Sequence, residues 1–140
     1  MPLASKELAE QAANSMLEIG ALDVRIFDLR NITSIVDYFV IGSANSVPHI
    51  KAVVDEVNDQ LETMDTQVWH TEGKQGWRWV LLDYVDVVVH VFQEETREFY
   101  GLERLWGDAP VTQVYVDSET GETLQKVIST SVSKVVETLE

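Results

Sequence analysis

Two adjacent runs of β-branched, leucine and aromatic residues, Trp77–Asp83 and Asp86–Phe92, are separated only by Tyr84 and Val85. Runs of this length and composition, joined by so short a connection, predict a β-hairpin. An isolated hairpin is only marginally stable in water, so the rest of the chain must supply strands or helices that pack against it. The hairpin therefore predicts a larger sheet around these residues.

The alternation of side chains along this hairpin predicts two very different faces. If Tyr84 and Val85 form the loop, Asp83 lies opposite Asp86 and Trp79 lies opposite His90, and cross-strand partners share a face. The other face is almost entirely aliphatic, which is typical of a core, whereas a mixture of aromatic and acidic side chains is typical of a recognition surface. The mixed face carries Trp77, Trp79, Leu81, Asp83, Asp86, Val88, His90 and Phe92.

Two alternatives to this assignment stay open. Tyr-Val lacks the glycine or asparagine that two-residue turns favour, and a loop longer by one residue would move one strand's side chains to the opposite face. A further layer of the fold, such as the C-terminal part of the chain, could also bury the aromatic side chains, because large aromatic residues are common in cores.

Helical and strand patterns alternate along the rest of the chain. Apolar residues at helical spacing predict two long helices, and shorter apolar runs predict strands before and after the second helix. Together with the hairpin, the order is α-β-β-α-β-β-β-α, which favours an α/β domain with a mixed sheet and helices mainly on one face. The predicted helices span residues 5–19, 46–64 and 93–100, and the additional strands span 22–26, 36–41 and 66–70.

A turn-forming segment, Gly107–Pro110, predicts a boundary. Residues 1–106 then form the α/β domain, and residues 107–140 form a C-terminal extension of unknown role. Within the extension, residues 111–116 predict a strand and 117–121 a turn. The apolar residues from Leu124 to Leu139 fit a helix, although their serine, threonine and valine neighbours also allow a strand.

The composition excludes several classes of function. The chain has no cysteine, so it contains no disulfide and no thiolate metal site. Its formal net charge of −14 argues against broad binding to nucleic acid, because basic side chains are needed to displace phosphate counterions. The charge favours a basic partner or serves solubility alone. No apolar run reaches the ~18 residues that span a bilayer, and the first residues lack a signal-peptide pattern, so we expect a soluble, cytoplasmic protein.

The sequence contains no convincing catalytic or metal site. The segment Gly42–Ser46 lies between a predicted strand and a helix, where backbone amides can bind phosphate, but it lacks the spacing of a phosphate-binding loop. Asp37, Asp83 and Asp86 are scattered and form no paired acidic motif for Mg²⁺. The three histidines show no spacing of metal ligands. We therefore expect neither an enzyme nor a cofactor or a metal.

Several motifs between Val36 and Trp106 match one family. They are Asp37–Ser43, the long run Trp79–Phe92, and the shorter matches His49, Glu72-Gly73, Glu94-Glu95, Arg97, Tyr100, Leu102-Glu103 and Leu105-Trp106. In these residues the chain resembles the ribosomal silencing factor family, also called Iojap-like proteins. The resemblance implies an α/β fold related to the nucleotidyltransferases, without the carboxylate set of an enzyme. No shared signature is evident beyond Gly107.

The resemblance also implies a function. Members bind the protein numbered fourteen on the intersubunit face of the large ribosomal subunit, block joining to the small subunit, and lower translation when nutrients are short. Free members are commonly homodimers. Ribosomal proteins are basic, so an acidic chain would be attracted to one and repelled by bare rRNA phosphate.

The residues and the resemblance together predict a partner-binding surface on the aromatic side of the hairpin, with carboxylates pairing with basic residues of the partner. The predicted contact residues are Glu72, Trp77, Trp79, Leu81, Asp83, Asp86, His90, Tyr100, Glu103 and Trp106. Trp77 could instead serve the dimer. Two functions of other classes stay open: a nucleotidyltransferase-like enzyme that binds Mg-nucleotide at the Gly42-Ser43 turn, and an adaptor for a non-ribosomal protein.

Overall fold

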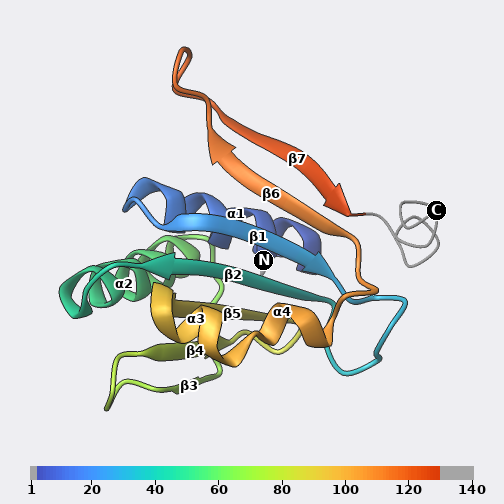
Figure 1. The fold of residues 1–140 in the computed structure, drawn as a ribbon, viewed down its shortest axis with the longest axis horizontal. Helices are drawn as coiled ribbons and strands as arrows, with labels where there is room; N and C mark the ends of the chain where they lie inside the picture. Colours follow the sequence, from blue (N-terminus) through green and yellow to red (C-terminus); the bar gives the residue numbers. More distant parts are fainter. Residues whose placement is uncertain (1–2, 130–140) are drawn as a thin grey trace.

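A computed structural model of the chain describes residues 3–129, which form a single α/β domain. Its mixed seven-stranded sheet has the strand order β3-β4-β5-β2-β1-β6-β7 (Figure 1). The predicted order α-β-β-α-β-β-β-α is confirmed, and a short helix and two strands follow it. The elements are α1 (Ser5–Glu18), β1 (Leu22–Asp28), β2 (Tyr38–Ala44), α2 (Val47–Thr63), β3 (His70–Glu72), β4 (Trp79–Asp83), β5 (Val87–Gln93), α3 (Glu94–Tyr100), α4 (Leu102–Leu105), β6 (Val111–Val116) and β7 (Thr123–Ser129).

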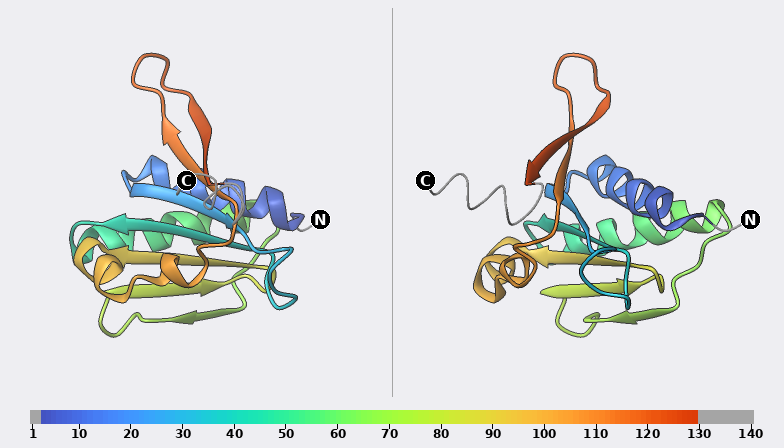
Figure 2. Two further views of the ribbon diagram at one scale, coloured as in Figure 1. Left: turned by 45° about the vertical axis from the view of Figure 1, so that its right-hand side comes forward. Right: turned by 90° about the vertical axis from the view of Figure 1, so that its right-hand side faces the viewer.

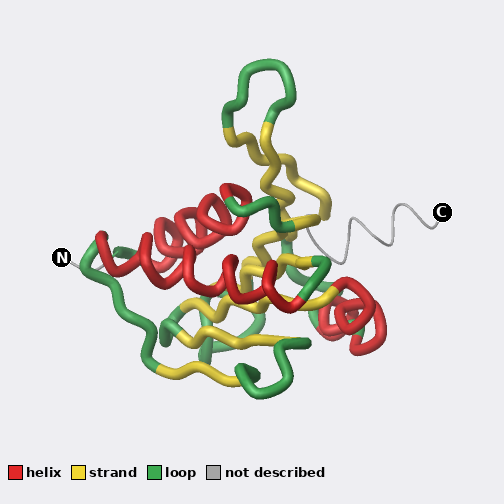
Figure 3. The backbone as a smooth tube through the Cα atoms, turned by 90° about the vertical axis from the view of Figure 1, so that its left-hand side faces the viewer, coloured by secondary structure: helices red, strands yellow, loops and turns green. Residues whose placement is uncertain are grey.

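The helices lie on both faces of the sheet, but unequally. The long helices α1 and α2 cover one face, and the short helices α3 and α4 lie against the opposite face (Figures 2 and 3). Strands β2 and β5 pair in parallel at the centre of the sheet, and the remaining neighbours are antiparallel. Among the helices of residues 3–129, none is long and apolar enough to cross a membrane.

The main core lies between the sheet and the two long helices. Helix α1 contributes Ala9, Ala12 and Ala13, whose small side chains let the helix lie close to the strands. Gly42 of β2 faces this helix, and a Cβ atom at that position would lie 2.5 Å from Cε of Met16. Close packing therefore explains Gly42, which lies within a strand and not in the turn that the sequence predicted.

The hairpin forms with a different register from the expected one. Trp79 pairs with Phe92 and Asp83 with Val88, so the predicted pairs of Trp79 with His90 and of Asp83 with Asp86 are wrong. The Tyr84 N–H donates to the carbonyl of Val87, which makes Val85 and Asp86 the loop.

Two features explain this position of the loop. Val85 takes a φ of +78°, the left-handed backbone that tight hairpin turns require. Tyr84 is buried in the main core, where its hydroxyl donates a hydrogen bond to Asn58, so it does not lie in the loop. The new register moves each partner by two positions, an even number, and the predicted faces of Trp79–Asp83 and Val87–Phe92 are therefore confirmed.

The sheet continues past the predicted boundary at Gly107–Pro110. Strand β6 pairs with β1, and β7 pairs with β6, so the two strands form a ribbon at one edge (Figure 1). The strand predicted over 111–116 is confirmed. Residues 123–129 form a strand, so in this part the strand alternative is confirmed and the helix is wrong. The remainder of the predicted segment lies outside the described residues. Cross-strand pairing with β6 satisfies the backbone groups on one side of this strand.

Candidate functional site

The side of the sheet opposite α1 and α2 carries a group of interacting rings, here called the aromatic face: Phe39, Trp79, His90, Phe92, Tyr100 and Trp106. The rings of Trp79 and Phe92, which are cross-strand partners, stack with centroids 4.8 Å apart. Phe39 on the neighbouring strand β2 contacts His90 at 4.7 Å. The alternation of strands β2, β4 and β5 therefore gathers these rings from three strands.

Helices α3 and α4 pack on this side of the sheet and contribute the last two rings, Tyr100 and Trp106. The ring of Tyr100 lies 5.3 Å from that of Trp79, and the ring of Trp106 lies 5.6 Å from that of Phe39. Gly101, with a φ of +57°, allows the sharp turn between the two helices. A second apolar cluster forms beneath them from Phe27, Leu29, Val36, Ile41, Phe92, Ala109 and Val111. The alternative that a further layer buries part of the face is therefore correct, and His90 and Phe92 are buried.

One end of the aromatic face is open to solvent. Phe99 is 81% exposed and Tyr100 is 58% exposed. Together with Trp79, they line a cavity of about 530 Å³ whose other wall includes Gly73 and Arg78. Phe99 is not among the predicted contact residues, although two adjacent aromatic residues in a short helix were a usable signal: they project about 100° apart, so one of them tends to face solvent.

The predicted carboxylates near this face differ in their contacts. Asp83 accepts a hydrogen bond of 2.7 Å from the Val85 N–H, which stabilises the hairpin loop. Asp86 lies exposed in that loop. Glu72 lies exposed on β3 and contacts His70 at 3.1 Å.

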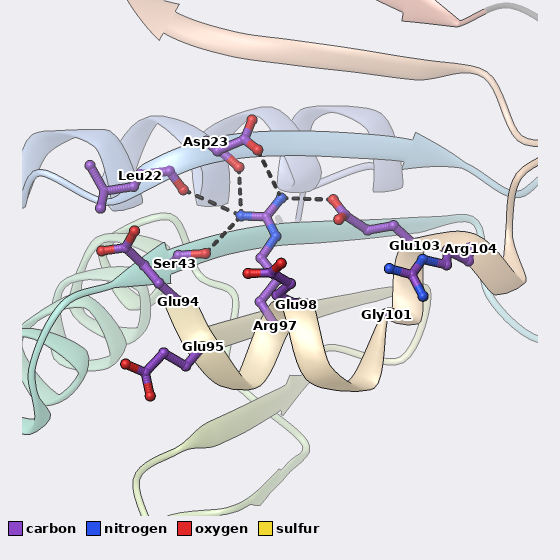
Figure 4. Close-up of a pocket in the computed structure, with 10 residues that line it drawn as sticks. All are labelled: Leu22, Asp23, Ser43, Glu94, Glu95, Arg97, Glu98, Gly101, Glu103 and Arg104. Carbon is purple, nitrogen blue, oxygen red and sulfur yellow. Dashed lines mark hydrogen bonds and ion pairs between the residues drawn. The ribbon is translucent and has the colours of Figure 1, made fainter.

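Glu103 is held within the protein by a buried arginine. Nη2 of Arg97 donates to Glu103 at 2.7 Å, and Nη1 donates to the Asp23 carbonyl and to the Ser43 hydroxyl, each at 2.9 Å (Figure 4). Arg97 thereby connects α3 and α4 with the ends of β1 and β2. Ser43 belongs to the segment whose backbone amides were considered for phosphate binding, and its hydroxyl accepts a hydrogen bond from Arg97.

His90 forms the buried floor of the aromatic face. The indole N–H of Trp79 donates to its Nδ1 at 3.0 Å, so the proton of the neutral ring lies on Nε2. Burial lowers the pKa of His90 to about 3, because the charged ring would lose its hydration. Nε2 of His90 and Nε1 of Trp106 have no hydrogen-bond partner among the described residues. Within residues 3–129, no group of three histidine or acidic side chains could hold a metal ion.

Trp77 does not share the aromatic face, and that part of the prediction is wrong. It lies before β4 with a φ of +55°, and its side chain packs against the main core beside α2. The ammonium group of Lys51 lies 5.0 Å from the centre of its ring. The left-handed backbone at Trp77 interrupts the strand alternation on which the prediction depended.

Comparison with protein families gives a match over almost the whole chain. A model described as "ribosomal silencing factor during starvation" matches residues 2–136. The chain belongs to this family. A ribosomal silencing factor of Bacillus subtilis is 39% identical over 109 residues, which cover 78% of this chain and 92% of the relative. The chloroplastic protein Iojap of Zea mays is 32% identical over 111 residues, covering 79% of this chain and 48% of the relative.

Two solved structures superpose on this chain and share its fold. A protein from Chromobacterium violaceum superposes with a TM-score of 0.72 at 28% identity, covering 75% of this chain and 88% of that one. A protein from Bacillus halodurans superposes with a TM-score of 0.66 at 34% identity, covering 72% and 94%. The ribosomal silencing factors are regulatory factors and not enzymes, as the names of the relatives indicate.

Proposed function

We propose that this ribosomal silencing factor binds the basic protein numbered fourteen on the intersubunit face of the large ribosomal subunit. By occupying that face, it blocks joining to the small subunit and represses translation under nutrient limitation. Family membership supports the ribosomal role, and one structural observation supports the location of the contact: the open end of the aromatic face, where Trp79, Phe99 and Tyr100 line a cavity.

The open end has the composition of a binding hot spot. Tyrosine, tryptophan and phenylalanine offer large apolar areas with few rotatable bonds, so their immobilisation on binding costs little entropy. Phe99 and Tyr100 are already exposed, and burying them under a partner removes apolar surface from water. Leu81 extends this surface along β4 toward the hairpin loop, because it shares the face of Trp79.

The acidic residues on β3 and at the hairpin loop, which lie along the strands from the open end, suit a basic partner. Asp86 and Glu72 are exposed, and Asp83 is partly exposed and keeps oxygen lone pairs free for a second hydrogen bond. Their negative charges attract lysine and arginine during approach and repel rRNA phosphate. Direct readout of nucleic acid and contact with a membrane are not part of this proposal.

Three other predicted residues do not contact the partner themselves but hold the contact residues in place. His90 lies beneath Trp79 and accepts its indole N–H. Glu103 pairs with Arg97, and Trp106 packs on Phe39, so both hold the short helices against the sheet. Trp77 lies toward α2 and has no contact role here. The free protein is proposed to be a cytoplasmic homodimer.

The location of the contact is tested by two variants with the same change of charge. Asp86→Lys alters the exposed hairpin loop, and Asp59→Lys alters an exposed position on α2, on the other face of the sheet. Affinity for purified large subunits is measured together with inhibition of subunit joining. We expect Asp86→Lys to weaken both by about tenfold or more, whereas Asp59→Lys changes them by less than about threefold. Equal effects of the two variants would remove the hairpin loop from the interface.

Sedimentation of a cell lysate tests the ribosomal partner itself. The proposal expects the protein to sediment with free large subunits. Recovery only in the slowly sedimenting fractions, bound to an unrelated protein, would favour the adaptor function.

A further inference from the structure

A small cavity lies beside the first turns of α1, on the side of the sheet that the two long helices cover. Its volume is about 220 Å³, and segments far apart in the sequence form its walls: α1, strands β1 and β2, and the ribbon of β6 and β7. Ala9 and Ile26, which belong to the main core, form its apolar part. Cavities for drug-sized molecules measure about 300–1,000 Å³, so this one suits a smaller ligand.

The hydroxyl group of Tyr38 is an unused donor at this cavity. Tyr38 is 4% exposed and lines the cavity, and its hydroxyl forms no hydrogen bond with any described residue in 3–129. Burial raises the pKa of this hydroxyl, and the charge of Asp28 raises it further, so the proton is retained. Asp28 and Glu10, whose charges act on the hydroxyl, also line the cavity, which indicates that the hydroxyl faces it. A buried donor without a partner favours a ligand that offers an acceptor.

Four charged side chains line the cavity, and two of them neutralise each other. Arg30 donates to both carboxylate oxygens of Asp28, at 2.9 and 2.7 Å. These hydrogen bonds lower the pKa of Asp28, so both partners stay charged and the pair is neutral in sum. Within the described part of the chain, Lys6 forms no ion pair, and Glu10 accepts a hydrogen bond of 2.8 Å from the Gln125 amide and keeps lone pairs free. One ammonium group and one carboxylate therefore remain for a ligand.

We propose that this cavity binds a small zwitterion, an α-amino acid with a short side chain. The ammonium group of the ligand pairs with the carboxylate of Glu10. The carboxylate of the ligand accepts the hydrogen bond that the Tyr38 hydroxyl has free and pairs with the ammonium group of Lys6. The apolar part of the cavity, formed by Ala9 and Ile26, receives a short aliphatic side chain.

The balance of charges favours a zwitterion over a simple anion or cation. An anion such as phosphate meets the carboxylates of Glu10 and Asp28, and a cation meets Lys6 and Arg30. Like charges at short distance oppose binding, whereas a zwitterion offers each charge an opposite partner. The cavity therefore discriminates by the presence of both charges in one small molecule.

This cavity is separate from the aromatic face, which lies on the other side of the sheet. The inference therefore does not depend on the proposed ribosomal contact. A ligand here connects α1 with the ribbon, because Glu10 lies on α1 and its partner Gln125 lies on β7. Binding to the folded protein alone should raise the melting temperature as the ligand concentration rises.

Isothermal titration calorimetry of the full chain with L-alanine, L-serine and L-valine tests the proposal. Propionate and ethylamine are matched probes, because each resembles L-alanine but lacks one of its two charges. We expect at least one amino acid to bind with a dissociation constant below about 1 mM, and propionate and ethylamine to bind at least about tenfold more weakly than L-alanine. Weaker binding by all three amino acids would overturn the proposal, as would equal binding by propionate, ethylamine or inorganic phosphate.

Two variants locate the ligand within the protein. Tyr38→Phe removes only the hydroxyl, and Glu10→Gln removes the charge but keeps an oxygen that can accept from Gln125. We expect each variant to weaken binding at least about fivefold. Glu7→Gln makes the same change of charge at an exposed position of α1 outside the cavity and should bind normally. Circular dichroism and urea unfolding establish that the variants are folded.

Normal binding by both cavity variants would overturn the proposal, and so would an equal loss in Glu7→Gln, because the ligand would then lie elsewhere. Large-subunit binding of the unaltered protein is measured separately, so either proposal can fail alone.

Discussion

Trp79 and His90 are joined by a hydrogen bond of 3.0 Å between the indole N–H and Nδ1 of the imidazole. They lie on neighbouring strands but are not direct cross-strand partners, since His90 pairs with Leu81. The bond fixes the tautomer of a buried histidine and connects the floor of the aromatic face with its open end. The orientation of Trp79 therefore depends on a neutral His90.

The buried His90 makes stability depend on pH. Its pKa of about 3 in the folded protein lies below the ordinary value of 6.5, so the unfolded chain binds a proton more readily. Stability contributed by the neutral ring is complete above pH 6.5 and declines as pH falls toward 3, by up to about 1.4 kcal/mol per pH unit. Urea unfolding between pH 7.5 and 5.5 measures this slope. His90→Gln, which cannot titrate, should show a smaller slope, and an equal slope would contradict the prediction.

Among the charged residues, substitution of Arg97 should reduce the stability of the fold most. Arg97→Gln removes hydrogen bonds to the Asp23 carbonyl, Ser43 and Glu103, and leaves a partly buried carboxylate without its cation. We expect the free energy of unfolding to fall by about 2–3 kcal/mol in urea titrations. The exposed neighbour Arg104 is the control, and Arg104→Gln should cost less than about 0.5 kcal/mol. Similar losses in both variants would show that the buried hydrogen bonds are not responsible.

Replacing Gly42 with a larger residue should destabilise the protein, because the side chain of Met16 lies next to it. Gly42→Ala adds a methyl group 2.5 Å from Cε of Met16 and 3.3 Å from Cγ2 of Val24. We expect a loss of about 1–2 kcal/mol in thermal or urea unfolding. The double variant Gly42→Ala with Met16→Ala should lose less than the sum of the two single variants, because the shorter side chain makes room. Additive losses would indicate that the methyl group does not meet Met16.

Phe99 should matter for binding but not for folding. Because its side chain is largely exposed, Phe99→Ser should change the free energy of unfolding by less than about 0.5 kcal/mol. If the open end of the aromatic face is the contact, affinity for large subunits should fall about tenfold. Ala52→Ser, at an exposed position of α2, is the control and should bind normally. Normal binding by Phe99→Ser would place the contact elsewhere.

If the proposed partner is correct, association with the isolated ribosomal protein should depend on salt. Raising the ionic strength from about 0.1 M to about 1 M shortens the screening length from about 10 Å to about 3 Å. The association rate constant, measured by stopped flow, should therefore fall with added salt. Asp86→Lys should show a shallower dependence, because it reverses a charge at the proposed contact. A rate that is independent of salt would mean that the acidic surface does not guide the encounter.

Local patterns determined much of this structure. The order of helices and strands follows from apolar periods of 3.6 and 2 residues, which depend on near neighbours in the chain. The faces of β4 and β5 were predictable for the same reason: Trp79 and Leu81 must share a side whatever the register. The specific run from Trp79 to Phe92 was also sufficient to indicate the family, which the match over residues 2–136 confirms.

Contacts between distant residues decided the rest. The hydrogen bond between Tyr84 and Asn58, 26 positions away, accompanies a hairpin loop that begins one residue later than composition suggested. Arg97 reaches Ser43, 54 positions away, and so holds α3 and α4 against the sheet. Pairing with β6 made β7 a strand where the local pattern favoured a helix. A period in the sequence specifies which residues share a face, but only packing between distant segments specifies whether that face is buried, because burial depends on what lies opposite it.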